Sequence, residues 1–450
     1  MFNPLEEKSF PIEKTFMDWK MMYPKSYRLC ETDPYTKARI ILMNGTEFEA
    51  TGFSRAFSRR CDNQDLKREL ALMRRIEQQQ QKRISCLRPK EETILETTLS
   101  YEQLAVDLTA ELALMEENCN AKNALNFALL EDFDHLYRYS NLMDLEYGTD
   151  PKNYVGDYTE IMPARPTISE HRHPYDSIFY PADMTDAPRQ RLSLQTILNT
   201  RIIVAAEQQT MNFYMNVASL YHKSDLGRRL YQEIGMIEEE HVSQYESLTD
   251  PTLSNLEELF LHELTECYLY YSALETEKDP YIRRIWDECL IQEIAHLHKA
   301  KDLLEIYEKK DWQELVPSVT FSSPLILRPH IEYVRTIIAT TAGNTERRED
   351  ILSVKELPNR SSFYFYQGVV NNDIPYVASH AVIDARIRCK GMDYRYETSP
   401  NPVKVLSDRK IDNVTLGRIP GLTPSATSFC GTTESDCGCS VKGCDNSVRW

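Results

Sequence analysis

Three segments of the chain carry an acidic residue three positions before a histidine, each within a run that reads as helical. The pairs are Asp132/His135, Glu238/His241 and Glu293/His296. On an α-helix, residues i and i+3 lie on one face, so the carboxylate and the imidazole of each pair point the same way. The chain has 69 acidic residues and 10 histidines, so the pairs alone are only a mild excess over chance. A fourth pair, Glu170/His173, falls in a proline-rich stretch and is read as accidental.

Each helical pair also has a glutamate 30 or 31 residues upstream, on the preceding predicted helix. These glutamates are Glu102, Glu207 and Glu263. A helix rises about 1.5 Å per residue, so a helical hairpin with a short turn brings residues with this spacing back to the same height. The spacing predicts three hairpins, at about 92–119 with 121–147, 191–222 with 225–248, and 253–276 with 279–309. The alternative is a set of exposed charged helices whose periodicity is accidental.

This pattern resembles the ferritin-like superfamily of di-metal carboxylate proteins, which includes rubrerythrins, manganese catalases and ferritins. The resemblance covers about residues 91–310. It implies a mainly α fold, a ferritin-like antiparallel helical bundle built from three helical hairpins, with mixed or irregular N- and C-terminal extensions. It also implies a site in which inward-facing carboxylates and imidazoles hold two iron or two manganese ions per chain.

Two combinations of hairpins could supply such a site. The first and second hairpins contribute Glu102, Asp132, His135, Glu207, Glu238 and His241; the second and third contribute Glu207, Glu238, His241, Glu263 or Glu266, Glu293 and His296. The long connection at 148–190 suits the crossover of a ferritin-like bundle and favours the first combination. The second combination has glutamate at every acidic position, whereas the first has the shorter Asp132. If the first combination is used, the third hairpin is a degenerate or supporting repeat, or serves a second site with another subunit.

The resemblance implies a cytoplasmic oxidoreductase that reacts with O₂ or peroxide, as a rubrerythrin-like peroxidase or oxidase or as a catalase. No pair of CxxC motifs is present, so electrons would come from a separate electron donor or from cysteines near the C-terminus. Tyr139 and Tyr245 follow their histidines by four residues, and core packing is favoured for them over a redox role. The alternatives are a metal-storage or metal-handling protein and a metal-free structural protein that keeps the bundle.

The composition of the chain limits the classes of partner that the protein is expected to bind. The net charge of −17 disfavours binding to nucleic acid or to an anionic membrane. No run of 18 apolar residues and no secretory signal is visible, which predicts a protein without a membrane span. Eleven cysteines, an odd number, fit reduced thiols in the cytoplasm better than a disulfide framework. A homo-oligomer is expected.

Four regions are predicted along the chain. Residues 1–90 form an N-terminal extension with a β-hairpin at 38–50, turning at Asn44-Gly45, and an amphipathic helix at 63–83. Residues 91–310 form the bundle. Residues 311–425 are irregular, with a short helix at 333–341 and strands or extended segments at 361–370 and 376–388. Residues 426–450 form a flexible tail that contains Cys430, Cys437, Cys439 and Cys444.

Overall fold

The computed structural model describes residues 1–156, 158–161, 175, 184, 192–341, 344–348, 350–353, 356–358, 360–371 and 376–390. These residues are mainly helical, so the expected α class is confirmed. The one sheet within the described ranges has two antiparallel strands, β1 (Asn344–Arg347) and β2 (Asp350–Ser353). Short helical turns occur at η1 (Ile12–Lys14), α5 (Lys152–Val155) and η3 (Trp312–Glu314).

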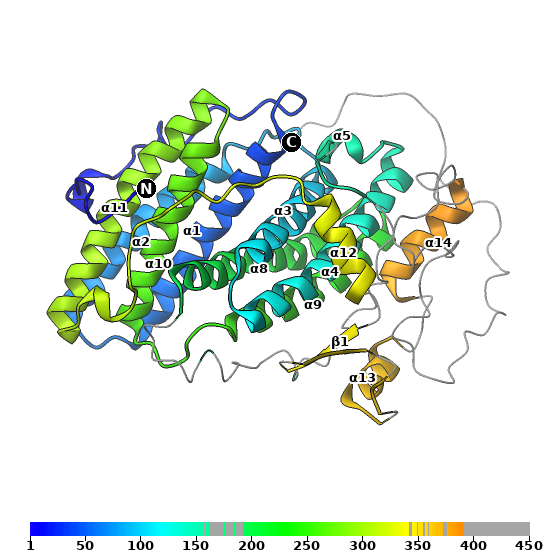
Figure 1. The fold of residues 1–450 in the computed structure, drawn as a ribbon. Helices are drawn as coiled ribbons and strands as arrows, with labels where there is room; N and C mark the ends of the chain where they lie inside the picture. Colours follow the sequence, from blue (N-terminus) through cyan, green and yellow to red (C-terminus); the bar gives the residue numbers. More distant parts are fainter. Residues whose placement is uncertain are drawn as a thin grey trace.

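The longest helices of the described chain form two groups of four (Figure 1). The first helix group contains α3 (Ile94–Met115), α4 (Cys119–Tyr147), α8 (Leu194–Leu220) and α9 (Asp225–Glu246). The second helix group contains α1 (Pro34–Arg60), α2 (Gln64–Ser85), α10 (Asn255–Thr276) and α11 (Pro280–Glu308). Within each group every helix contacts two others around a ring, and α1 contacts α3 and α8 of the other group. In sequence, the first group is therefore inserted between the two halves of the second.

Short connections with capping side chains define the helix pairs. Each pair is joined by three or four residues, and the last of these is the N-cap of the following helix: Asn63, Asn118, Ser224 or Asp279. Each of these side chains accepts a hydrogen bond from backbone N–H groups that the helix itself leaves unpaired. Connections this short force the two helices of a pair to run antiparallel, which brings residues about 30 apart to the same level.

The predicted β-hairpin at 38–50 is wrong, because these residues lie inside α1. Gly45 marks a close contact between helices instead of a turn. A Cβ atom at this position would lie 3.0 Å from the Cβ of Gln209 and 3.1 Å from the carbonyl oxygen of Ala205, both on α8. The glycine thus lets the two helix groups approach closely. The helix predicted at 63–83 is confirmed as α2.

Gly45→Ala is therefore expected to destabilise the protein. Alanine normally favours a helix interior over glycine by about 1 kcal/mol, but overpacking against α8 should outweigh this gain and cost about 1–3 kcal/mol. The matched control is Gly52→Ala on the same helix, where a Cβ meets nothing within 4 Å and stability should rise. Urea unfolding of both variants measures the difference, and equal stabilisation by the two substitutions would contradict a close contact at Gly45.

Beyond α11 the chain first packs on α10, through Trp312 and Phe321, and then covers the first helix group. The helix predicted at 333–341 is confirmed as α12 (Ile331–Thr341), which contacts α4. The strands or extended segments predicted at 361–370 and 376–388 are wrong, because these segments form α13 (Ser362–Val370) and α14 (Ala378–Lys390). Tertiary contacts override their β-forming composition: α14 packs on α4 and α9, and Glu233 accepts a hydrogen bond from the backbone N–H of Ala378 at its first turn. The predicted tail at 426–450 and most of the predicted crossover at 148–190 lie outside the described residues.

No helix of the described segments combines the length and the apolarity required to cross a membrane. The apolar side chains instead form a large core that runs through both helix groups. At the centre of each group, however, the buried side chains are acids and imidazoles.

Candidate metal centres

Six predicted ligands meet inside the first helix group, and we call them the first cluster. They come from all four helices and are buried: Glu102 from α3, Asp132 and His135 from α4, Glu207 from α8, and Glu238 and His241 from α9. The short helix connections place each upstream glutamate level with the acid–histidine pair of the next helix. The structure thus brings together the set expected from the first and second hairpins.

Glu238 lies at the middle of the first cluster. Its Oε1 is 2.9 Å from Nδ1 of His135, and its Oε2 is 3.2 Å from Nδ1 of His241. The nearby atoms divide into two subsets, one with Glu102 and His135 and one with Asp132, Glu207 and His241, and Glu238 belongs to both. Within each subset the possible ligand atoms lie within 4.8 Å of one another. A carboxylate with one oxygen in each of two adjacent ligand subsets is suited to bridge two metal ions.

Several polar atoms of the first cluster lack a well-aligned hydrogen bond among the described residues. They are Glu102 Oε2, Asp132 Oδ1, His135 Nε2, both oxygens of Glu207, Glu238 Oε2 and His241 Nδ1. Burying polar atoms without partners is costly, and native proteins contain few of them. Their common location at one point fits coordination of a cation.

The outward nitrogen of His241 has a carboxylate partner. Glu131 Oε2 lies 2.7 Å from Nε2 of His241, while Nδ1 of the same ring faces Asp132 at 3.3 Å and Glu207 at 3.8 Å. Imidazoles that bind metals commonly donate their other N–H to a carboxylate, which orients the ring and fixes its tautomer. The Glu131 contact therefore directs Nδ1 of His241 into the cluster.

Burial and mutual repulsion shape the protonation of this cluster. Burial raises the pKa of Glu102 and Asp132 well above the usual range for carboxyl groups, and raises that of Glu207 to about 7. Burial also acts to raise the pKa of Glu238, but hydrogen bonding and the charge of the two histidines outweigh it and lower the value. Without a cation the cluster therefore retains protons, which metal binding would release.

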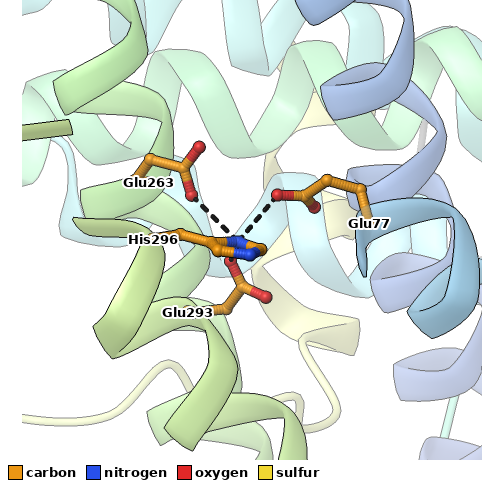
Figure 2. A group of neighbouring side chains, drawn as sticks. All are labelled: Glu77, Glu263, Glu293 and His296. Carbon is orange, nitrogen blue, oxygen red and sulfur yellow. Dashed lines mark hydrogen bonds and ion pairs between the residues drawn. The ribbon is translucent and has the colours of Figure 1, made fainter. Parts of the chain in front are cut away.

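A second cluster of the same kind lies inside the second helix group (Figure 2). Its members are all buried: Glu47 from α1, Glu77 from α2, Glu263 and Glu266 from α10, and Glu293 and His296 from α11. The predicted combination of the second and third hairpins is wrong in its grouping, because the ligands on α10 and α11 lie with Glu47 and Glu77 of α1 and α2 and not with the ligands of α8 and α9. Glu47 and Glu77 were not predicted as ligands from the sequence.

His296 is the centre of the second cluster. Its Nδ1 lies 2.8 Å from Glu77 Oε1, 3.2 Å from Glu293 Oε2 and 3.6 Å from Glu263 Oε2, and Figure 2 shows Glu77 and Glu263 facing the ring from two sides. A neighbouring subset contains Glu47, Glu77 and Glu266. Both oxygens of Glu266 lack hydrogen-bond partners among the described residues, as do Glu47 Oε2, Glu77 Oε2, Glu263 Oε2 and His296 Nε2.

The two clusters match position by position. Glu47 precedes Glu77 by 30 residues, as Glu102 precedes Asp132, and Gln80 follows Glu77 by three residues where the first cluster has a histidine. Gln80 donates a hydrogen bond to Glu293 at the place where His135 contacts Glu238. A search for the spacing of 30 alone, with glutamine allowed for histidine, would have found this fourth helix pair.

A tyrosine is repeated in the same way. Tyr214 and Tyr270 each lie seven residues after the upstream glutamate of their helix. The hydroxyl of Tyr214 donates a hydrogen bond to Glu102, and that of Tyr270 donates one to Glu47. In each cluster, a buried tyrosine hydroxyl thus fixes the position of one glutamate.

The other aromatic side chains around the two clusters differ. In the first, the ring centroid of Tyr139 lies 5.2 Å from that of Tyr214 and 4.9 Å from that of Tyr231. Tyr245 is also buried, with its ring centroid 6.4 Å from that of His241. The positions that correspond to Tyr139 and Tyr245 in the second cluster are Ile84 and Ala300. The tyrosine-rich environment is therefore specific to the first cluster.

The chain was compared with protein-family models, with curated proteins and with solved structures, and none of them matches it. What the structure establishes is a helical protein with buried clusters of carboxylates and imidazoles that could hold metal ions.

Proposed function

We propose that the protein is a ferritin-like di-metal carboxylate protein in which each helix group holds two iron or two manganese ions, and that the first cluster reacts with O₂ or peroxide. The observation that carries the proposal is the position of Glu238, whose two oxygens face two separate ligand subsets. The proposed stoichiometry is thus twice that expected from the sequence.

The donor atoms of the first cluster fit these metals. Four carboxylates and two imidazoles, with no thiolate among them, form an oxygen-rich shell that suits iron or manganese. Four carboxylates carry four negative charges, which two divalent cations would balance. Without this balance, one buried group of like charges would be costly to maintain.

The residues around the first cluster would prepare it for redox chemistry. A bound pair of iron or manganese ions would supply the two-electron exchange that peroxide reduction or dismutation requires. The protein would hold the ligands in place through Glu131 at His241 and Tyr214 at Glu102. Because all six ligand side chains are fully or almost fully buried, bulk water would be excluded from the reacting centre.

The test exchanges the residue that most clearly distinguishes the two clusters. His135→Gln gives the first cluster the amide of the second, and Gln80→His makes the reciprocal change. Loss of one imidazole ligand should lower peroxide turnover by the metal-loaded protein at least about tenfold, whereas Gln80→His should leave it unchanged. Oxygen evolution and reductant oxidation measure turnover; full activity in His135→Gln would contradict a reactive first cluster.

A second candidate function is metal storage or handling, and the composition of the second cluster favours it. Five carboxylates and one imidazole form a harder, more weakly selective ligand set than that of the first cluster. Bound ions without turnover would support this function for the whole protein. A metal-free structural protein is the remaining alternative, and the unpartnered buried atoms of both clusters argue against it.

A further inference from the structure

A cavity of about 350 Å³ lies where the two helix groups meet. Side chains of α1, α8 and α10 and the end of α9 line it. One lining residue, Glu266, also belongs to the second cluster. The cavity therefore reaches the second cluster through this side chain.

His262 connects the cavity to Glu266. Its Nδ1 is 3.0 Å from Glu49 Oε2, and its Nε2 is 3.5 Å from Glu266 Oε1. The His262 side chain is 13% exposed, whereas Glu266 is completely buried. The ring of Phe53 stacks on the imidazole with a centroid separation of 5.7 Å and holds its orientation. Nε2 of His262 and both oxygens of Glu266 lack hydrogen-bond partners among the described residues.

The first cluster has no corresponding side chains. The positions equivalent to Glu49, His262 and Glu266 hold Leu104, Ala206 and Thr210. The helical framework that the clusters share therefore does not require this carboxylate–imidazole–carboxylate series. It is an additional feature of the second cluster.

The lining of the cavity has more acidic than basic side chains. It contains the carboxylates of Glu49, Glu246, Glu258 and Glu266, and its basic groups are Arg201 and His262. Arg201 pairs with Glu258 at 2.9 Å, so these two charges cancel, and the carboxylates of Glu49, Glu246 and Glu266 remain with the single imidazole of His262. A low-dielectric recess with an excess of acidic groups concentrates cations.

We propose that this cavity is the route by which divalent cations such as Mn²⁺ or Fe²⁺ reach and leave the second cluster. Glu49, His262 and Glu266 form a transient cation site at its inner end. An ion held by Glu49 and His262 would pass to Glu266, whose carboxylate lies in the same ligand subset as Glu47 and Glu77. This inference rests on the proposed function, because it requires that the second cluster binds metal.

The test measures the rate of Mn²⁺ uptake by the full chain, with the free ion followed by electron paramagnetic resonance after rapid mixing. Glu238→Ala would serve as the background, so that the second cluster accounts for the uptake. His262→Gln and, separately, Val204→Trp, which fills the cavity without removing a ligand, should each slow uptake about tenfold. Both should leave the final amount of bound Mn²⁺ unchanged. Glu239→Gln, an exposed substitution on α9, is the matched control.

The possible results of this experiment distinguish failure of the access route from failure of the proposed function. Unchanged uptake rates in both variants would overturn the access route alone. A lower final amount of Mn²⁺ in His262→Gln would make His262 a permanent ligand and would also overturn it. A wild-type chain that takes up no Mn²⁺ would refute the proposed function and the route with it.

Discussion

Glu238→Ala is expected to remove both metal ions from the first cluster and to leave the second cluster loaded. The reason is that Glu238 supplies one oxygen to each ligand subset, so its truncation damages both at once. It also leaves His135 without the carboxylate that contacts its Nδ1. Elemental analysis after loading should show bound metal falling from about four ions per chain to about two.

Two further substitutions make this result specific. Glu77→Ala should empty the second cluster in the same way, because Glu77 belongs to both of its ligand subsets and its Oε1 lies 2.8 Å from Nδ1 of His296. Glu239→Ala, next to Glu238 in sequence but exposed, should retain all ions. If Glu238→Ala and Glu77→Ala both empty the whole protein, the clusters are not independent; if neither loses metal, the assigned ligands are wrong.

Metal binding is expected to stabilise the folded chain strongly. Each cluster confines at least four carboxylates in the protein interior, and cations would remove their repulsion. An ion present at 100 times its dissociation constant stabilises the folded state by about 2.7 kcal/mol. Several such ions should raise Tm by about 10 °C or more. Calorimetry with and without Mn²⁺, after removal of metal by a chelator, measures this shift.

The double variant Glu238→Ala/Glu77→Ala provides the control for the thermal experiment. It should unfold at the same temperature with and without Mn²⁺, because each cluster has lost the carboxylate that its two ligand subsets share. A shift in this variant equal to that of the wild-type chain would place the stabilising ions elsewhere. If Mn²⁺ does not raise the Tm of the wild-type chain, cations do not stabilise the buried carboxylates.

The sequence predicted the first cluster because its signal is local. A spacing of three on one helix and of about 30 across a short turn depends only on helix geometry. Asp132, the shorter acid, fits this pattern, and its Oδ1 lies 3.3 Å from Nδ1 of His241. The crossover argument for combining the first and second hairpins also led to the set of residues that the structure brings together.

The second cluster was missed for two local reasons. Gln80 replaces a histidine, so the search for acid–histidine pairs did not reach α2. Asn44-Gly45 has the composition of a tight turn, yet Gly45 serves the contact with α8. Because residues 38–50 were predicted as a β-hairpin, Glu47 was not placed on a helix. The ligands on α10 and α11 were therefore left without the glutamates of α1 and α2 that complete the second cluster.

The cavity and the C-terminal helices depend on contacts that no local pattern contains. The cavity requires α1, α8 and α10 to meet, although these helices are far apart in sequence. Likewise, α14 is helical where its composition favours a strand, and it lies against α4 and α9. Such features follow from tertiary packing and not from propensity.

The most direct test of the account is the metal content of protein produced with both iron and manganese supplied and purified without chelators. We expect about four iron or manganese ions per chain, two for each buried cluster. A protein that contains neither metal, and takes up none on anaerobic reconstitution, would contradict it.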